Sequence, residues 1–280
     1  TYYTNGHLMP AKTKQLYYAD FINLISFAYR ILSLIKNINF AHNETSNVEN
    51  AIRHKFNLQI DIQDIVRLAL ANHKVNKWLF AKLFQVIKPR ACLVLVSYGK
   101  EHFIQAAKSL GIPTIELQHG IVSRYHMAYS FPNKKKKNTF PDYFFSFGEF
   151  WKQSVNFPIS EKRIFNIGYP HLDTCISLLT HVRKTDTLLF ISQGTIGKEL
   201  SCIAIELMKH APENIRIVYK LHPGEYDRWR DEYSWLVESD LEVVDSHTPD
   251  LYELFAQAKW QVVVYSTAIF EGLAFKCQTY

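Results

Sequence analysis

From about residue 89 onward, short apolar runs alternate with longer segments of helical period. The runs are rich in Val, Ile, Leu and Phe, are too short for ordinary helices, and are typical of buried parallel strands. They lie at 91–96, 114–117, 142–147, 188–191, 215–221, 241–245 and 261–265. Helical patterns at 101–110, 149–155, 198–210, 225–236, 249–258 and 268–275 separate or follow them. This alternation predicts an α/β fold of βαβ units with right-handed crossovers and parallel sheets.

The pattern before residue 89 is mainly helical. Phe21–Lys36 is apolar on most faces but is interrupted by polar residues, so a buried helix is favoured over an interfacial membrane helix. The polar stretch Asn43–Asn47 predicts a loop. Ile62–Ile87 returns to helical spacing, and Pro89 is expected to end that helix.

Composition narrows the class of protein only slightly. The net charge of +6 suits an anionic substrate, nucleic acid or an acidic membrane surface without choosing among them. The 4 cysteines lack metal-ligand spacing, which fits a reducing cytoplasm and argues against a disulfide framework. The chain begins at Thr1 and ends at Tyr280 just as another strand pattern starts, so we expect a piece of a longer protein.

Three strand-to-helix turns in the C-terminal half carry small, hydroxyl-bearing or cationic residues. They are Ser192–Thr195, Lys220–Gly224 and Tyr265–Thr267. Because parallel strands end at one edge of a sheet, such turns can build a phosphate cradle from backbone N–H groups and hydroxyls. The plainer interpretation also stays open: a helix-starting proline, hydroxyl N-caps and a solvated glutamate at 271.

The motifs in these turns resemble a known family. The sequence KLHP at 220–223, followed by S-T-x-x-x-E at 266–271, resembles bacterial glycosyltransferases of the GT-B fold. The most similar patterns are those of polysialyltransferase-like and CDP-glycerol glycerophosphotransferase-like enzymes, and the resemblance covers roughly Pro89–Tyr280. The segment AAKSLGIPTIELQHG also resembles their acceptor-domain segment, although it lacks the Trp of the teichoic-acid form.

The resemblance implies two Rossmann-like domains whose parallel sheets face a central cleft. Residues 1–160 would form the acceptor-side domain with a helical N-terminal part. Residues 161–280 would form the nucleotide-sugar-binding domain, which is expected to continue beyond Tyr280. The implied donor-binding residues are Ser192, Gln193, Gly194, Thr195, Lys220, His222, Pro223, Gly224, Ser266, Thr267 and Glu271.

The catalytic candidates divide between the two halves. His222 would donate a hydrogen bond to a donor phosphate, and a glutamate at position 271 resembles the ribose-binding residue of the relatives. His119 would orient or deprotonate the acceptor hydroxyl, with Glu116, His126 and Asp173 in reserve. The expected acceptor-binding residues are Tyr98, Gly99, Gln118, Gly120, Arg124 and His126.

The predicted reaction is inverting transfer of a sugar (a hexosyl, sialyl or Kdo group) from a CMP- or CDP-linked donor to a surface polysaccharide or lipopolysaccharide acceptor. No Asp-x-Asp pair occurs, so neither a metal nor any other cofactor is expected. We expect a cytoplasmic protein that does not bind nucleic acid. The run Lys134–Lys137 is typical of a solvated surface, and contact with an anionic membrane face or an anionic polymer is the alternative.

Two alternatives remain. A nucleotide-sugar 2-epimerase has the same fold and would bind a UDP-sugar without an acceptor. A non-catalytic basic module would instead bind a polyanion, and it would carry its basic residues on one face rather than at strand ends.

Overall fold

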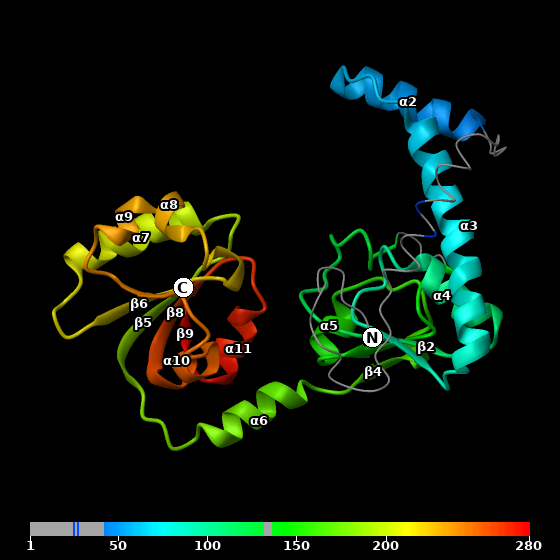
Figure 1. Ribbon diagram of the computed structural model, residues 1–280. Helices are drawn as coiled ribbons and strands as arrows, with labels where there is room; N and C mark the ends of the chain where they lie inside the picture. The colour runs from blue at the N-terminus through cyan, green and yellow to red at the C-terminus, as the bar shows by residue number, and fades with distance from the viewer. Residues whose placement is uncertain (1–24, 26, 28–41, 132–135) are drawn as a thin grey trace. The chain divides into compact units, whose positions relative to one another are not determined.

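The computed structural model describes residues 25, 27, 42–131 and 136–280 (Figure 1). The chain divides into two compact units. Unit 1 comprises Thr1–His119 and Ser123–Asn166, and unit 2 comprises Gly120–Val122 and Ile167–Tyr280. The helix expected at 21–36 lies outside the described residues apart from positions 25 and 27, and so do Lys134 and Lys135.

Unit 1 includes two helices that precede its sheet, α2 (His42–Phe56) and α3 (Ile62–Ile87). The loop predicted at Asn43–Asn47 is wrong, because these residues belong to α2. The Glu49 carboxylate in α2 accepts hydrogen bonds from the backbone N–H groups of Ile62 and Gln63, at 2.9 and 3.2 Å. Glu49 therefore caps the start of α3, so α2, the helix formed by this polar stretch, stabilises the next helix. Among the described residues, no helix is both long and apolar enough to cross a membrane.

The sheet of unit 1 contains four parallel strands in the order β1-β2-β3-β4. These are β1 (Cys92–Val94), β2 (Thr114–Leu117), β3 (Tyr143–Ser146) and β4 (Ile164–Asn166). Between them run α4 (Glu101–Ser109), α5 (Glu149–Gln153) and the short η2 (Glu161–Arg163). Phe84 of α3 and Ala107 of α4 belong to one buried cluster with Cys92 of β1, so α3 and α4 pack together beside that strand.

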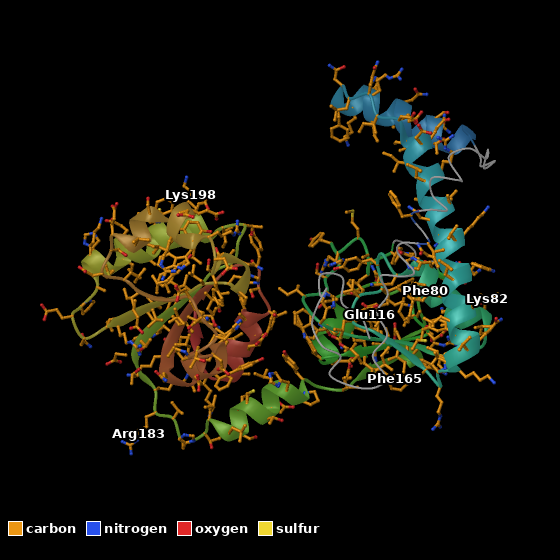
Figure 2. The ribbon with its side chains drawn as sticks, viewed as in Figure 1. Phe80, Lys82, Glu116, Phe165, Arg183 and Lys198 are labelled. Carbon is orange, nitrogen blue, oxygen red and sulfur yellow. The ribbon has the colours of Figure 1, made fainter. Side chains whose placement is uncertain are left out.

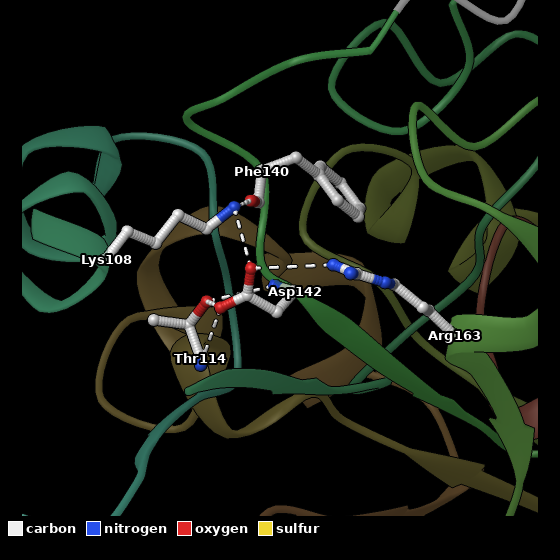
Figure 3. A network of polar contacts seen from close by, with 5 residues as sticks. All are labelled: Lys108, Thr114, Phe140, Asp142 and Arg163. Carbon is white, nitrogen blue, oxygen red and sulfur yellow. Dashed lines mark hydrogen bonds and ion pairs between the residues drawn. The ribbon is translucent and has the colours of Figure 1, made fainter. Parts of the chain in front are cut away.

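One carboxylate ties the entries of two neighbouring strands together (Figure 3). Asp142 Oδ2, just before β3, accepts hydrogen bonds from the Thr114 N–H at 3.0 Å and the Thr114 hydroxyl at 2.8 Å. Asp142 Oδ1 lies 3.2 Å from the Lys108 ammonium and 3.8 Å from the Arg163 guanidinium. Burial alone would raise the pKa of Asp142, but the hydrogen bonds from Thr114 and the charge of Lys108 hold that pKa below its ordinary value.

The sheet of unit 2 contains five parallel strands in the order β7-β6-β5-β8-β9. They are β5 (Thr185–Ile191), β6 (Arg216–Lys220), β7 (Glu242–Val244), β8 (Ala258–Val263) and β9 (Gln278–Thr279). The chain moves outward from β5 to β6 and β7, then returns to place β8 on the other side of β5. This reversal is a topological switch point, the place where open α/β sheets bind their ligands.

Helices cover both faces of this sheet (Figure 1). The helices of unit 2 are α6 (Pro170–Leu178), α7 (Gly197–His210), η3 (Pro223–Glu225), α8 (Trp229–Glu232), α9 (Ser234–Val237), α10 (Leu251–Gln257) and α11 (Ala268–Ala274). Successive β5 side chains alternate between the faces: Leu189 and Ile191 join the core under α10 and α11, and Phe190 joins the core under α7, α8 and α9. Burial on both faces explains why the strands appear in the sequence as continuous apolar runs.

The continuous helix expected at 225–236 is instead broken into η3, α8 and α9. Tyr233, between α8 and α9, leaves the helical region with φ −125° and ψ 58°. Its hydroxyl donates to Glu225 at 2.7 Å, a contact that fixes the end of α8 against η3. The two parallel sheets confirm the predicted α/β class, and their placement across a central cleft stays a prediction.

Candidate functional site

A pocket of about 200 Å³ opens in unit 2 at the carboxyl ends of its strands. Residues that follow β5, β6, β7 and β8 all contribute to its wall. Five of the predicted donor-binding residues line it: Ser192, Lys220, His222, Pro223 and Ser266. Tyr226, His247 and Asp250 line it as well and were not identified from the sequence. The structure thus brings together at one pocket the turns that the sequence singled out separately.

His222 is the N-cap of η3, and its ring is oriented by a backbone bond. The ring Nδ1 accepts from the Gly224 backbone N–H at 3.1 Å, while the backbone N–H of His222 donates to Glu225 Oε2 at 2.8 Å. In a neutral imidazole an accepting Nδ1 places the proton on Nε2. The exposed ring therefore offers an N–H donor, the group needed to meet a phosphate oxygen.

Lys220 is more constrained than the sequence suggested. It is 6% exposed, and its ammonium donates to the Tyr226 hydroxyl at 2.6 Å and to the Ser246 carbonyl. Burial lowers the pKa of Lys220, and the charges of Asp245 and Asp250 act in the opposite direction. Two of its three N–H donors thus tie the end of β6 to Tyr226, just after η3, and to Ser246, just after β7, so Lys220 shapes the pocket as well as adding charge.

A fully buried carboxylate that the sequence analysis missed supports these turns. Glu225 Oε1 accepts from the Ser192 hydroxyl at 3.0 Å and from the Tyr233 hydroxyl at 2.7 Å, and its Oε2 accepts from the His222 N–H. The Ser192 hydroxyl is therefore committed to the protein rather than free for a ligand. A Cβ on Gly197 would come within 2.4 Å of Glu225 Oε1, so a glycine is required where α7 starts.

The turns after β5 and β8 meet across the switch point. The Gln193 amide nitrogen donates to the Tyr265 carbonyl at 3.1 Å. Tyr265 has a φ of 55°, a left-handed conformation that is unusual for a bulky residue, and its side chain is 77% exposed. The Ser266 hydroxyl accepts from the Ala268 N–H at 3.2 Å and so acts as a local cap. Gly194 and Thr195 are exposed in the turn before α7.

Glu271 lies half-buried in α11, near the Tyr252 hydroxyl. Burial and then its contacts with Tyr169 and Glu271 raise the pKa of Tyr252. Next to it, a Cβ on Gly272 would lie 2.0 Å from Gln261 Oε1, so Gly272 permits the close packing of α11 on β8. Glu271 is thus a half-buried carboxylate close to a phenol, and its ribose-binding role stays a prediction.

In unit 1, Glu116 lies in β2 (Figure 2) and is fully buried. Its Oε1 accepts from the Tyr129 hydroxyl at 2.5 Å and from the Ser97 N–H at 3.3 Å, and no residue that the structure describes donates a hydrogen bond to its Oε2. Burial raises the pKa of Glu116 to about 7, although the bonds from Tyr129 and Ser97 oppose this rise. The carboxyl group is closed off from solvent and holds the Tyr129 hydroxyl in place, and the catalytic role of Glu116 stays a prediction.

Three of the predicted acceptor-side residues gather around Tyr129 and the carboxyl ends of β1 and β2. The Tyr129 ring centre lies 4.7 Å from that of His126 and 5.9 Å from that of Tyr98. His119 is exposed and directly follows the turn residue Gln118. Burial of part of the ring lowers the pKa of His119, the nearby Leu95 backbone acts to raise it, and the nearby charge of His126 also lowers it. The His119 imidazole is therefore neutral at pH 7, as a general base must be.

The remaining predicted residues have varied positions. The Gln118 amide oxygen accepts from the Phe147 N–H at 2.9 Å and from the Ser146 hydroxyl at 3.1 Å, so it connects β2 to β3, and its acceptor-binding role stays a prediction. Arg124 lies over the Tyr125 ring at 6.0 Å, and Asp173 is exposed in the first turn of α6.

Gly99 has a φ of 74° in the turn after β1, and Gly120 follows His119. Within the basic run, Lys137 lies 3.9 Å from Glu101 and over the ring of Phe131. Over the described ranges, no group of three or more His, Cys, Asp and Glu side chains is arranged to hold a metal ion.

No family model matches the chain, and no curated protein matches it. Among solved structures, it is similar to the wall teichoic acid polymerase TagF, with 18% identity over 60% of this chain and 48% of that one and a TM-score of 0.39. It is similar to UDP-N-acetylglucosamine 2-epimerase from Rickettsia bellii, with 17% identity, 68% and 55% coverage and a TM-score of 0.47. The MnaA–UDP co-structure from S. aureus shows 14% identity, 76% and 63% coverage and a TM-score of 0.43. The chain spans about half the length of the first two of these structures.

Proposed function

We propose that the protein is a glycosyltransferase that binds a nucleotide-activated sugar at the strand-end pocket of unit 2. The observation that carries the proposal is the ring of His222, whose Nε2–H is oriented at the wall of a pocket built from four strand ends. This pocket lies at the edge of the sheet where α/β proteins bind their ligands, and it is also lined by the Lys220 ammonium.

The chemistry of glycosyl transfer suits these groups. As the bond between sugar and phosphate breaks, negative charge grows on the leaving phosphate and needs oriented donors. In this proposal His222 supplies the donor, and the charge of Lys220 favours the anion. On the acceptor side, the neutral imidazole of His119 takes the proton of the attacking hydroxyl. We propose that the reaction is inverting and needs no metal.

The donor and acceptor are proposed more specifically from the motif resemblance. The KLHP and S-T-x-x-x-E motifs favour a cytidine-linked donor, and the acceptor would be a surface polysaccharide or a glycolipid. We propose that the protein acts in the cytoplasm, with the basic run at 134–137 contacting the anionic membrane face.

A nucleotide panel tests the donor site directly. A ligand that binds the folded state raises the melting temperature, so CMP, CDP, UMP and UDP are added separately to the full chain. The proposal expects stabilisation by a cytidine nucleotide. Equal or larger stabilisation by UDP would remove the cytidine assignment, and the absence of stabilisation by all four would remove the nucleotide-binding function.

A second candidate function is nucleotide-sugar 2-epimerisation, because the same pocket suits the nucleotide of either class of enzyme. Product analysis separates them: the transferase releases nucleotide only when an acceptor is present, whereas the epimerase converts a UDP-sugar to its C2 epimer without one. The transferase assay is repeated with EDTA, and loss of turnover that Mg²⁺ or Mn²⁺ restores would contradict the metal-independent mechanism.

A further inference from the structure

Arg228 lies between the first two turns of the donor site and was not identified from the sequence. It precedes α8, and its Nε donates to the Gly224 carbonyl at 3.0 Å. Its Nη1 donates to Glu232 at 2.9 Å. Two acceptors on different sides of the guanidinium thus hold an exposed cation in a defined orientation.

The remaining edge of the guanidinium faces the turn after β5. Arg228 Nη2 lies 3.4 Å from the position that a Cβ would occupy on Gly194. Within the described part of the chain, and leaving aside the two chain neighbours of Gly194, no other atom lies within 4 Å of that position, so the guanidinium edge faces the backbone of this turn with no side chain between them. An anion placed there would meet the charge of Arg228 and the turn that leads into α7.

The other cations of this region are committed elsewhere. The Lys220 ammonium is bound to Tyr226 and the Ser246 carbonyl. Lys198, in the first turn of α7 (Figure 2), lies over the Trp235 ring at 5.7 Å. Arg230 forms an ion pair with Asp245 at 2.7 Å. Arg228 is therefore the cation best placed to meet an anion over Gly194.

We propose that Arg228 is a phosphate-binding residue of the donor site and holds a phosphate of the nucleotide against the turn at Gly194. This inference rests on the proposed function and adds to it a cation that recognises the phosphate rather than the nucleoside. A planar guanidinium suits phosphate because two parallel N–H donors meet two oxygens, which an ammonium does not reproduce.

The competing explanation is an ordinary surface pair between Arg228 and Glu232, one helical turn apart, which contributes little to stability. The two explanations predict different responses to paired substitutions. If Arg228 binds phosphate, Arg228→Gln weakens binding, and Glu232→Gln strengthens it by removing a carboxylate that competes for the guanidinium. If the pair is only structural, both substitutions leave nucleotide affinity unchanged.

The experiment is calorimetric titration of the full chain with CDP, UDP, cytidine and uridine. For the diphosphate that binds, we expect Arg228→Gln to reduce affinity about 10–100-fold, the range of a lost charge-assisted hydrogen bond, and to leave the affinity for the matching nucleoside unchanged. We expect Arg228→Lys to restore part of the loss and Glu232→Gln to increase affinity about 2–5-fold. Gly194→Ala places a methyl group 3.4 Å from Nη2 without removing the charge, so it should weaken diphosphate binding at unchanged melting temperature.

Arg230→Gln is the matched control, because it removes a neighbouring arginine whose partner is Asp245, and its diphosphate affinity should equal that of the wild type. Unchanged diphosphate affinity in Arg228→Gln, or an equal loss for the nucleoside, overturns the role of Arg228 while leaving nucleotide binding intact. If neither diphosphate binds the wild-type chain, the proposed function and this inference fail together.

Discussion

Each unit buries a glutamate beside the carboxyl ends of its strands, and the two carboxylates are satisfied differently. Glu116 in unit 1 and Glu225 in unit 2 are both 0% exposed, and each accepts a hydrogen bond from a tyrosine hydroxyl. The three donors to Glu225 are distributed over both of its oxygens. The donors to Glu116 both meet Oε1, and Oε2 has no partner among the described residues.

The difference shows that the stabilisation of a buried carboxylate depends on where its hydrogen-bond donors are placed as well as on its burial. A buried carboxylate is stable as an anion only when hydrogen bonds replace the water it has lost. At Glu116 this replacement is incomplete, and burial raises its pKa to about 7. Glu225 instead connects Ser192 to the turn of His222, and so holds together the residues that line the proposed donor pocket. Substitutions of His119 and His222 test the proposed division into an acceptor-side and a donor-side unit.

The largest effect is expected at the acceptor side. His119→Ala should reduce transfer about 10²–10⁴-fold, the usual cost of losing a general base, while nucleotide affinity stays close to that of the wild type. The lowered pKa of His119 adds a second test, because its imidazole is neutral at pH 7 and activity should fall only when acid protonates it. The measurements are product formation at saturating donor and nucleotide titration. Weaker nucleotide binding with normal transfer would place His119 on the donor side or in the structure.

His222 should give the next largest effect, on the donor side. His222→Ala removes the Nε2–H donor and is expected to lower kcat about 10²–10³-fold, by analogy with the loss of one oxyanion donor. The substitution also removes the acceptor for the Gly224 N–H, so His222→Asn is the control, since asparagine is a good N-cap. If His222→Asn retained full kcat, the role of His222 would be to cap η3, and the catalytic role proposed for it would be wrong.

The strands of the fold could be predicted because they appear in the sequence as apolar runs. Runs such as 188–191 and 215–221 are buried on both faces by helices, so their composition alone indicated parallel strands. The strand-end turns also lie where the pattern of strand followed by helix placed them, around the pocket of unit 2. The helix over Asn43–Asn47 was missed, because the use of Glu49 as a cap for α3 depends on residues 13 and 14 positions later.

The polar partners in the site could not be predicted for the same reason. Glu225 and Arg228 belong to a polar stretch that reads as a solvated helix, yet Glu225 bonds to Ser192, 33 positions away. Gln118 stands in a turn that resembles a substrate-binding motif, but its amide oxygen bonds to residues 28 and 29 positions later. Such contacts are set by which strands become neighbours, and local sequence does not record the pairing of individual side chains.

The comparison of the two glutamates predicts a pH dependence of stability in unit 1. Because folding raises the pKa of Glu116 from 4.5 to about 7, the folded state binds an additional proton between these values. The contribution of this carboxyl to stability is complete below about pH 4.5 and is lost as the pH rises through 7. Glutamine resembles the protonated form, so Glu116→Gln should remove this dependence and stabilise the protein at pH 8 by about 3 kcal/mol at most.

Urea unfolding of the wild type and of Glu116→Gln at pH 5 and pH 8 measures this difference in the free energy of unfolding. Glu225→Gln is the comparison variant: it weakens three hydrogen bonds to a carboxylate and should lower the free energy of unfolding by about 1–3 kcal/mol. If Glu116→Gln destabilised the protein at pH 8 as Glu225→Gln does, the unpartnered Oε2 of Glu116 would not have the effect assigned to it.

The smallest effect is expected at Asp142, a carboxylate whose partners include a cation. Its pKa is lowered in the folded state by Thr114 and Lys108, so its contribution to stability is present above the unfolded pKa of about 3.9 and is lost as the pH falls through the lower folded value. Asp142→Asn keeps one acceptor for Thr114 but loses the attraction to Lys108, and it should lower the free energy of unfolding at pH 7 by about 1–2 kcal/mol. Below pH 3 the difference between variant and wild type should shrink, which is the reverse of the dependence predicted for Glu116. Urea titrations at pH 3 and pH 7 measure it, and a difference that grew in acid would contradict the ion pair as its cause.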